Sequence, residues 1–309
     1  IRQSVPDSCC LAIGDGANDV AMIKAGNLGV GIIGKEGREA VNAADFAIGQ
    51  FRFLRGLLFV HGRYNYRRLS IFIYFTFYKN VINTMTMYLW SMLAMSSGEL
   101  LWPSLISDFF APAALTVLPI LVYPIFDTDV PKYIVAHAPR LYSPGIARTQ
   151  YTTLRLVGWI GESIYSAAIC AFVPSYLLTH DRYGTVSVST LAHATLWCCC
   201  IVNYFRLIFE NNSWTVIEVS SIFAMVAFLL VMTPLMSYVP FNVNPGFSWE
   251  RMNGTMQINM REPSFYLMLA LCVCLAILPK FIAASIKVAI YGSKTKWEAF
   301  MAERHAEIK

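Results

Sequence analysis

The stretch Gly14–Val20, with the sequence GDGANDV, follows the apolar run Cys9–Ile13 and precedes a segment predicted to form a helix. Asp15 and Asp19 therefore lie in a turn at the carboxyl end of a predicted strand, the usual place for a ligand site in an open parallel sheet. Carboxylate oxygens, completed by water and phosphate oxygens, are the ligands by which proteins commonly hold Mg²⁺. A GDG sequence alone would favour a loop without chemistry, whereas the whole stretch favours a magnesium site.

The longer sequence LAIGDGANDVAMI, residues 11–23, resembles the hinge motif that closes the phosphorylation domain of P-type ATPases. Val20, Met22 and Ile23 resemble the class IV branch, the phospholipid flippases, because cation pumps usually continue with Pro-Ala-Leu at this point. The resemblance implies that residues 1–50 form the end of a cytoplasmic, HAD-like α/β phosphorylation domain.

The same resemblance assigns roles to three side chains and implies that Mg²⁺ and ATP are cofactors. Asp15 would bind the catalytic Mg²⁺, Asp19 would support that metal site, and Asn18 would contact the phosphoryl group of the cofactor, with Asp19 beside it. All three are thereby candidate catalytic residues. No Asp-Lys-Thr-Gly-Thr stretch occurs in the 309 residues, so the aspartate nucleophile is absent, as are the actuator and nucleotide-binding domains. We expect a fragment of a longer protein.

The first 50 residues predict a β-α-β-α-β order, which is typical of the end of a doubly wound α/β domain. A segment of fewer than about 50 residues seldom buries a core by itself, so we expect its other half upstream. The strands are predicted at Cys9–Ile13, Leu28–Ile33 and Asp45–Ile48, and the helices at Val20–Ala25 and Arg38–Ala44.

The composition indicates a helical protein with several membrane spans. Of the residues 56% are hydrophobic and 14% are charged, and the mean hydropathy is +0.51. A soluble globule would be less apolar. Basic residues on one side of a membrane account for the net charge of +5, so no nucleic acid is expected as a partner. Most cysteines fall in apolar spans, and we expect reduced thiols.

Residues 51–68 are predicted to form a basic stalk helix that enters the membrane from the cytoplasm. Read from Gln50, the sequence is QFRFLRGLLFVHGRYNYRRLSIFIYF, in which arginines alternate with Phe and Leu at helical spacing. It resembles the flippase hallmark that links the phosphorylation domain to the membrane, and a continuous helix would couple the two. A solvated stalk with headgroup contacts is the simpler alternative.

Residues 69–290 are predicted to form six transmembrane helices, each of about 20 residues or more. Basic residues in the loop 127–153 and in the tail 291–309 predict that both are cytoplasmic, as the stalk is. The spans are predicted at Leu69–Met95, Leu105–Phe126, Leu154–Leu178, Val188–Phe209, Val216–Val239 and Phe265–Ile290.

Lys79 lies near the middle of the first predicted span, and an ionisable residue there is a candidate functional site because it is costly. Asn80 is adjacent, and Thr76 and Asn83 lie one turn to either side. A lysine that pairs with a carboxylate and holds helices together is the structural alternative. The string FYKN matches a flippase hallmark, which implies that this lysine forms part of the lipid path or couples lipid occupancy to dephosphorylation.

The second predicted span departs from the flippase pattern. When Leu115–Pro119 is aligned with the family, Ala111 and Pro112 stand where flippases carry Tyr-Asn. Asp108, one turn earlier, is a candidate replacement on the substrate path or an interfacial residue. Pro112 and Pro119 are expected to break or kink this helix.

Two other charges, Glu162 and Arg206, are expected to pair between helices or at the membrane interface. A cation pump would need several mid-membrane oxygen ligands, and these spans offer Asp108 and Glu162 with a lysine instead, which disfavours that function. An inactive membrane partner is a further alternative if the chain is complete at 309 residues.

Resemblance to flippases implies a protein that moves phospholipids from the outer to the cytoplasmic leaflet at the expense of ATP, through an aspartyl phosphate. It also implies a small glycoprotein accessory subunit, and a multi-pass location in Golgi, endosomal or plasma membrane.

Overall fold

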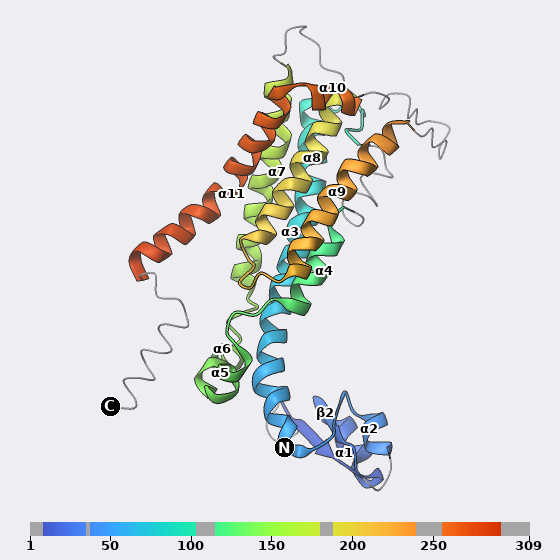
Figure 1. Ribbon diagram of the computed structural model, residues 1–309, viewed down its shortest axis with the longest axis vertical. Helices are drawn as coiled ribbons and strands as arrows, with labels where there is room; N and C mark the ends of the chain where they lie inside the picture. The colour runs from blue at the N-terminus through green and yellow to red at the C-terminus, as the bar shows by residue number, and fades with distance from the viewer. Residues whose placement is uncertain (1–8, 35–37, 103–114, 180–187, 239–254, 292–309) are drawn as a thin grey trace. The chain divides into compact units, whose positions relative to one another are not determined.

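The computed structural model describes residues 9–34, 38–102, 115–179, 188–238 and 255–291 (Figure 1). They form two compact units, each described by itself below. Unit 1 comprises Ile1–Asn65 with Pro131–Ala147, and unit 2 comprises Tyr66–Val130 with Arg148–Lys309. The boundary between the units falls within one long helix, α3, which runs from Arg63 to Leu93.

Unit 1 contains a parallel three-stranded sheet in the order β1-β2-β3. The predicted β-α-β-α-β order is confirmed, with strand and helix ends that differ by a few residues from the predicted ones. The strands are β1 (Leu11–Gly14), β2 (Leu28–Ile32) and β3 (Phe46–Ile48), and the helices are α1 (Val20–Ala25) and α2 (Glu39–Ala43).

The glycine-rich sequence of β2 has a steric reason. A Cβ atom added to Gly31 would lie 2.7 Å from the Cα atom of Val41 in α2, so the helix packs directly on the strand backbone. Val30, the neighbouring residue, is fully buried in the centre of the sheet. The sheet and its helices therefore pack closely despite the small number of residues.

The rest of the described part of unit 1 consists of short helical segments of different types. A 3₁₀ turn over Phe51–Phe53 is followed by a π-helix over Gly56–Gly62, so the predicted stalk does not begin as one continuous α-helix. Glycine at both ends of the π-helix lowers the propensity for a regular α-helix there. Later in the chain come α5 (Lys132–His137), a 3₁₀ turn over Pro139–Tyr142 and α6 (Ser143–Ile146).

Two stalk arginines of unit 1 bind backbone carbonyls of this later segment. Arg55 donates to the carbonyl oxygen of Ala136 at 2.5 Å through Nη2, and Arg63 Nε donates to that of Leu141 at 3.1 Å. These two guanidinium groups thus hold the segment from Ala136 to Leu141 by hydrogen bonds, and Arg55 is also exposed.

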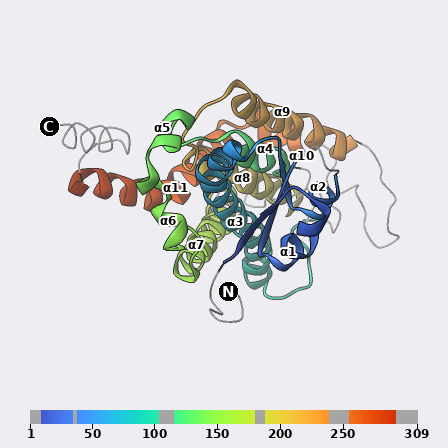
Figure 2. The ribbon, with the colours of Figure 1, turned by 90° about the horizontal axis from the view of Figure 1, so that it is seen from below.

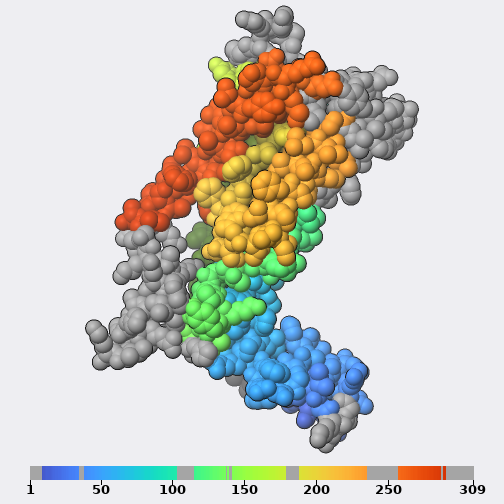
Figure 3. Space-filling view, viewed as in Figure 1, coloured from blue at the N-terminus to red at the C-terminus, as the bar shows by residue number. Residues whose placement is uncertain are grey.

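Unit 2 is a bundle of helices. Besides the part of α3 from Tyr66 onward, it contains α4 (Val117–Phe126), α7 (Thr153–Thr179), α8 (Val188–Ile208), α9 (Val216–Tyr238), α10 (Thr255–Arg261) and α11 (Pro263–Tyr291). The helix α8 packs against α4, α7, α10 and α11 and lies in the middle of the bundle in Figure 2. In Figure 3 its yellow surface is visible only in patches between α9 and α11.

Four helices in the described part of the chain are long and apolar enough to cross a membrane, where six were predicted. They are Thr153–Leu178, Val188–Ile208, Val216–Pro234 and Pro263–Ile286. The first predicted span lies in α3, which has 31 residues but carries more polar side chains. The second is represented by the ten residues of α4, since residues 103–114 lie outside the described part. The protein is therefore a mostly helical membrane protein.

Helix ends in unit 2 follow local chemistry. At the start of α9, Thr215 and Glu218 form a capping box, in which the Thr215 backbone N–H donates to the Glu218 carboxylate at 2.8 Å and the Glu218 N–H donates to the Thr215 hydroxyl at 3.3 Å.

Pro119 lies in the first turn of α4, where a missing N–H group costs little. The other proline expected to disturb this helix, Pro112, lies outside the described residues.

Candidate functional site

Asp19 holds the turn that follows β1. Its Oδ2 atom accepts hydrogen bonds from the backbone N–H groups of Asp15 at 3.1 Å and Gly16 at 3.4 Å. A Cβ atom added to Gly14 would lie 2.3 Å from the Asp19 Cβ, so the aspartate side chain packs directly on the glycine. The second aspartate of the motif, Asp19, thus has a structural role, because its carboxylate folds back onto Gly14 and the backbone that follows it.

Asp15 and Asn18 are exposed in this turn, at the carboxyl end of β1. A Cβ atom on Gly34, just past β2, would lie 3.4 Å from the Asp15 carbonyl oxygen, so the turn lies beside the end of the neighbouring strand. The turn offers the exposed carboxylate of Asp15 and the carboxylate of Asp19, which is held by two backbone hydrogen bonds. Mg²⁺ is commonly bound through one or two carboxylates with water and phosphate oxygens, so the residues present fit that ion.

Within the described residues, no three His, Cys, Asp or Glu side chains gather as a metal cluster. A site built wholly from protein ligands, such as a structural zinc site, is therefore not found in that part of the chain. All eight cysteines are free, as expected, and the run Cys198–Cys200 is buried in α8.

Lys79 is buried in α3, with 6% of its surface exposed, and its Nζ donates to the hydroxyl of Thr116 at 3.4 Å. Asn83, one turn further, is equally buried, whereas Asn80 is exposed. The structure thus brings two of the four candidate path residues, Lys79 and Asn83, to one buried face of α3 and turns Asn80 away from it. Asp108 lies outside the described residues.

Arg206 is fully buried and joins three helices. Its guanidinium binds both oxygens of Glu162 in α7, at 2.7 and 3.0 Å, and lies 2.7 Å from Glu210 just after α8. Lys280 of α11 also pairs with Glu210, and the Arg206 Cζ lies 3.9 Å from the centre of a Trp159 ring. The predicted pairing of Glu162 and Arg206 between helices is confirmed.

The environment of Glu210 favours its charged form. Burial alone would raise the pKa of this carboxyl group, but attraction by Arg206 and then by Lys280 outweighs burial and lowers it below its ordinary value. The cluster around Arg206 therefore contains two acidic and two basic groups whose charges balance.

Asp127 forms a second buried junction in unit 2, which the sequence did not assign. Arg67 Nη1 lies 2.9 Å from Asp127 Oδ2, and the other oxygen accepts from the backbone N–H groups of Asn212 at 2.8 Å and Ser213 at 3.1 Å. Arg68 Nε donates to the Asp127 carbonyl oxygen. The signals available in the sequence were the acidic residues of FDTDV, residues 126–130, and the stalk arginines Arg67 and Arg68, but nothing in the sequence paired them.

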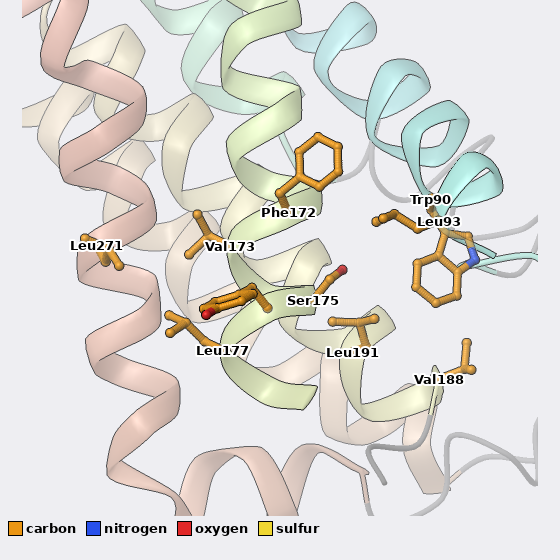
Figure 4. Close-up of a pocket in the computed structure, with 10 residues that line it drawn as sticks. Trp90, Leu93, Phe172, Val173, Ser175, Leu177, Val188, Leu191 and Leu271 are labelled. Atoms are coloured by element: carbon orange, nitrogen blue, oxygen red, sulfur yellow. The ribbon is translucent and has the colours of Figure 1, made fainter. Parts of the chain in front are cut away.

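An apolar pocket of about 870 Å³ lies between α3, α7, α8 and α11. Figure 4 shows Trp90 and Leu93 of α3 on one side and Leu271 of α11 on the other, with Phe172 and Leu191 between them. Lys79 is not among its lining residues, so this pocket is distinct from the polar face of α3.

The comparisons with known proteins place the chain in one family. A family described as "Phospholipid-translocating P-type ATPase C-terminal" matches residues 41–293. Phospholipid-transporting ATPase VD of Mus musculus is 32% identical over 92% of this chain and 20% of its own length. Probable phospholipid-transporting ATPase 11 of Arabidopsis thaliana is 30% identical over 91% of this chain and 23% of its own length. The chain thus spans about a fifth of these relatives, and it belongs to the family of phospholipid-translocating, class IV P-type ATPases.

Proposed function

We propose that this chain is the hinge and membrane region of an ATP-driven flippase that moves phospholipids from the outer to the cytoplasmic leaflet. Family membership and the four apolar helices support this function. The aspartyl phosphate would form on an Asp-Lys-Thr-Gly-Thr stretch, which these 309 residues do not contain. These 309 residues alone would lack the aspartate nucleophile, so we propose that ATP turnover requires the longer protein.

The turn after β1 is proposed to complete the phosphoryl-transfer site of a HAD-like domain ending near residue 50. Asp19 fixes the loop by accepting two backbone N–H groups. Asp15 then presents a carboxylate, and Asn18 an amide, to the ligand at the carboxyl edge of the sheet. Mg²⁺ bound there with ATP would neutralise charge on the transferred phosphoryl group.

Residues 51–68 are proposed as a stalk that transmits the phosphorylation state to a membrane domain at 69–290 with six spans. The stalk, the loop 127–153 and the tail 291–309 are proposed to be cytoplasmic because together they hold more Lys and Arg residues than the loops predicted on the other side. Association with a small glycoprotein subunit and residence in Golgi, endosomal or plasma membrane remain proposals that rest on family resemblance.

The observation that carries the transport proposal is the burial of Lys79 in α3. An ammonium group inside a membrane helix is expensive, and such groups commonly mark a substrate or ion path. Together with Asn83 it gives α3 one polar buried face, on which a lipid headgroup could find donors for its phosphate oxygens. We propose Lys79 and Asn83 as the described members of that path, with Asn80 and Asp108 as further candidates.

The test uses the intact protein that contains this sequence, reconstituted in lipid. Lys79→Ala is expected to leave phosphorylation by ATP intact and to weaken lipid-stimulated dephosphorylation by tenfold or more. The matched control is Thr84→Ala, since Thr84 is exposed on the same helix, and this variant should respond to lipid as the wild type does. Normal lipid-stimulated ATPase activity in Lys79→Ala would remove the basis for a transport role.

A further inference from the structure

Two buried asparagines in unit 2 have amide atoms without hydrogen-bond partners. Asn203 of α8 is 1% exposed, and neither its Nδ2 nor its Oδ1 has a partner among the described residues. Asn83 of α3 is 6% exposed, and its Nδ2 likewise has none there. Buried amides without partners are costly and rare, and ordered water is the usual way in which proteins satisfy them.

The helices that carry these asparagines touch at two levels. The Thr86 hydroxyl lies 3.6 Å from the Cys199 sulfur, and the Arg206 Cζ lies 5.5 Å from the centre of the Tyr78 ring. Residue numbers rise along α3 as they fall along α8, so the two helices are antiparallel where they meet. Figures 1 and 2 both show α3 and α8 side by side in the bundle.

This register brings the two amides to nearly the same level. Asn83 precedes Thr86 by three residues, and Asn203 follows Cys199 by four, so each lies on the contacting face of its helix. A rise of about 1.5 Å per residue puts them roughly 4.5 and 6 Å from the Thr86–Cys199 contact, in the same direction. Both amides therefore point to one interhelical region.

We propose that Asn83 and Asn203 hold ordered water between α3 and α8, in a site one turn from Lys79. Water can accept from Nδ2 of each amide and donate to Oδ1 of Asn203, which a ligand with acceptors only cannot do. A metal cation is disfavoured, because the site offers one unpartnered acceptor and an ammonium group lies on the same face of α3. The role of this site is to hydrate the polar face of α3 that carries Lys79. That role rests on the proposed function, whereas the existence of the water site does not.

The first experiment asks whether the two amides act together. In the intact protein in lipid nanodiscs, the midpoint of thermal unfolding is measured for Asn83→Leu, Asn203→Leu and the double variant. If they share water, each single change strands the other amide, and the double variant should be more stable than the sum of the two shifts predicts. Asn80→Leu, an exposed asparagine of α3, is the control and should combine additively with Asn203→Leu. Additive shifts for the Asn83 and Asn203 pair would overturn the proposal.

The second experiment asks whether water mediates the coupling, since a direct amide-to-amide hydrogen bond would also couple the two residues. Radiolysis of water labels buried side chains beside trapped water. Ile82, fully buried next to Asn83, should be oxidised in the wild type and protected in the double variant, whereas Leu229 of α9, equally buried, should stay unlabelled in both. Coupling without labelling of Ile82 would show a direct bond and overturn the proposal. Neither measurement depends on lipid transport, so its outcome is separate from that of the proposed function.

Discussion

At the scale of single residues, the two carboxylates of the GDGAND turn have different surroundings and should respond differently to substitution. Asp15→Ala removes an exposed side chain, so it is expected to abolish ATP turnover of the intact protein while changing its stability by no more than about 0.5 kcal/mol. Asp19→Ala removes two hydrogen bonds to a carboxylate and should also destabilise the phosphorylation domain, by about 1.5–3 kcal/mol. ATPase assays and thermal unfolding of both variants decide this.

The control for this pair is Glu39→Gln, an exposed acidic residue of α2, which should change neither quantity. A loss of stability in Asp15→Ala as large as that in Asp19→Ala would contradict the division of roles, because it would mean that Asp15 also holds the turn.

Glu210 provides a prediction about pH. Its pKa is lowered in the folded protein by Arg206 and Lys280 despite its burial, so its contribution to stability is present above the unfolded pKa of about 4.3. That contribution is lost as the pH falls from there through the lower folded pKa. Glu210→Gln should cost about 1.5–3 kcal/mol at pH 7 and should flatten the dependence of the unfolding midpoint on pH below 4.5. A variant that shows the same acid sensitivity as the wild type would count against this assignment.

At the scale of elements, the Asp127 carboxylate fastens the part of α3 that belongs to unit 2 to the connection between α8 and α9. Removing one partner of a buried ion pair leaves the other uncompensated, so Asp127→Ala is expected to destabilise unit 2 by about 3–5 kcal/mol. Asp129 lies further from Arg67, at 3.8 Å, and Asp129→Ala should cost less than half as much. The comparison is made by thermal unfolding of the two variants in detergent, and equal losses would contradict the ranking.

The elements differ in how well the sequence predicts them. The strands of unit 1 follow from apolar runs that lead into a glycine, and the long helices of unit 2 from apolar length, since both signals are local. The π-helix over Gly56–Gly62 and the short helix α10 have no such signal, because each depends on how neighbouring segments pack. The effect of Pro119 on helix geometry could not be predicted from the sequence either, because it depends on where α4 begins.

At the scale of the whole molecule, the family and the membrane class could be predicted from the sequence, because motifs and composition are read directly from the order and kinds of residues. The candidate site could be predicted only in part from the sequence. A lysine within an apolar helix is visible in the sequence, as is a pair of aspartates in a turn. The partners of these residues could not be predicted from the sequence. Thr116, which binds Lys79, lies outside α3, and Asn203 comes to the same level as Asn83 only because α3 and α8 are antiparallel.

The central position of α8 has a consequence for the response to different bilayers. Within its apolar window 83% of the residues are buried by protein, compared with 28% in α9 and 22% in α11. A change in hydrocarbon thickness or in acyl-chain order acts on surfaces that touch lipid, through tilt and mismatch. The outer helices would absorb such changes, while α8 and the polar groups it carries remain insulated from them. Lipid sorting among membranes of different thickness would then act on the periphery of the bundle and leave the geometry at its centre unchanged.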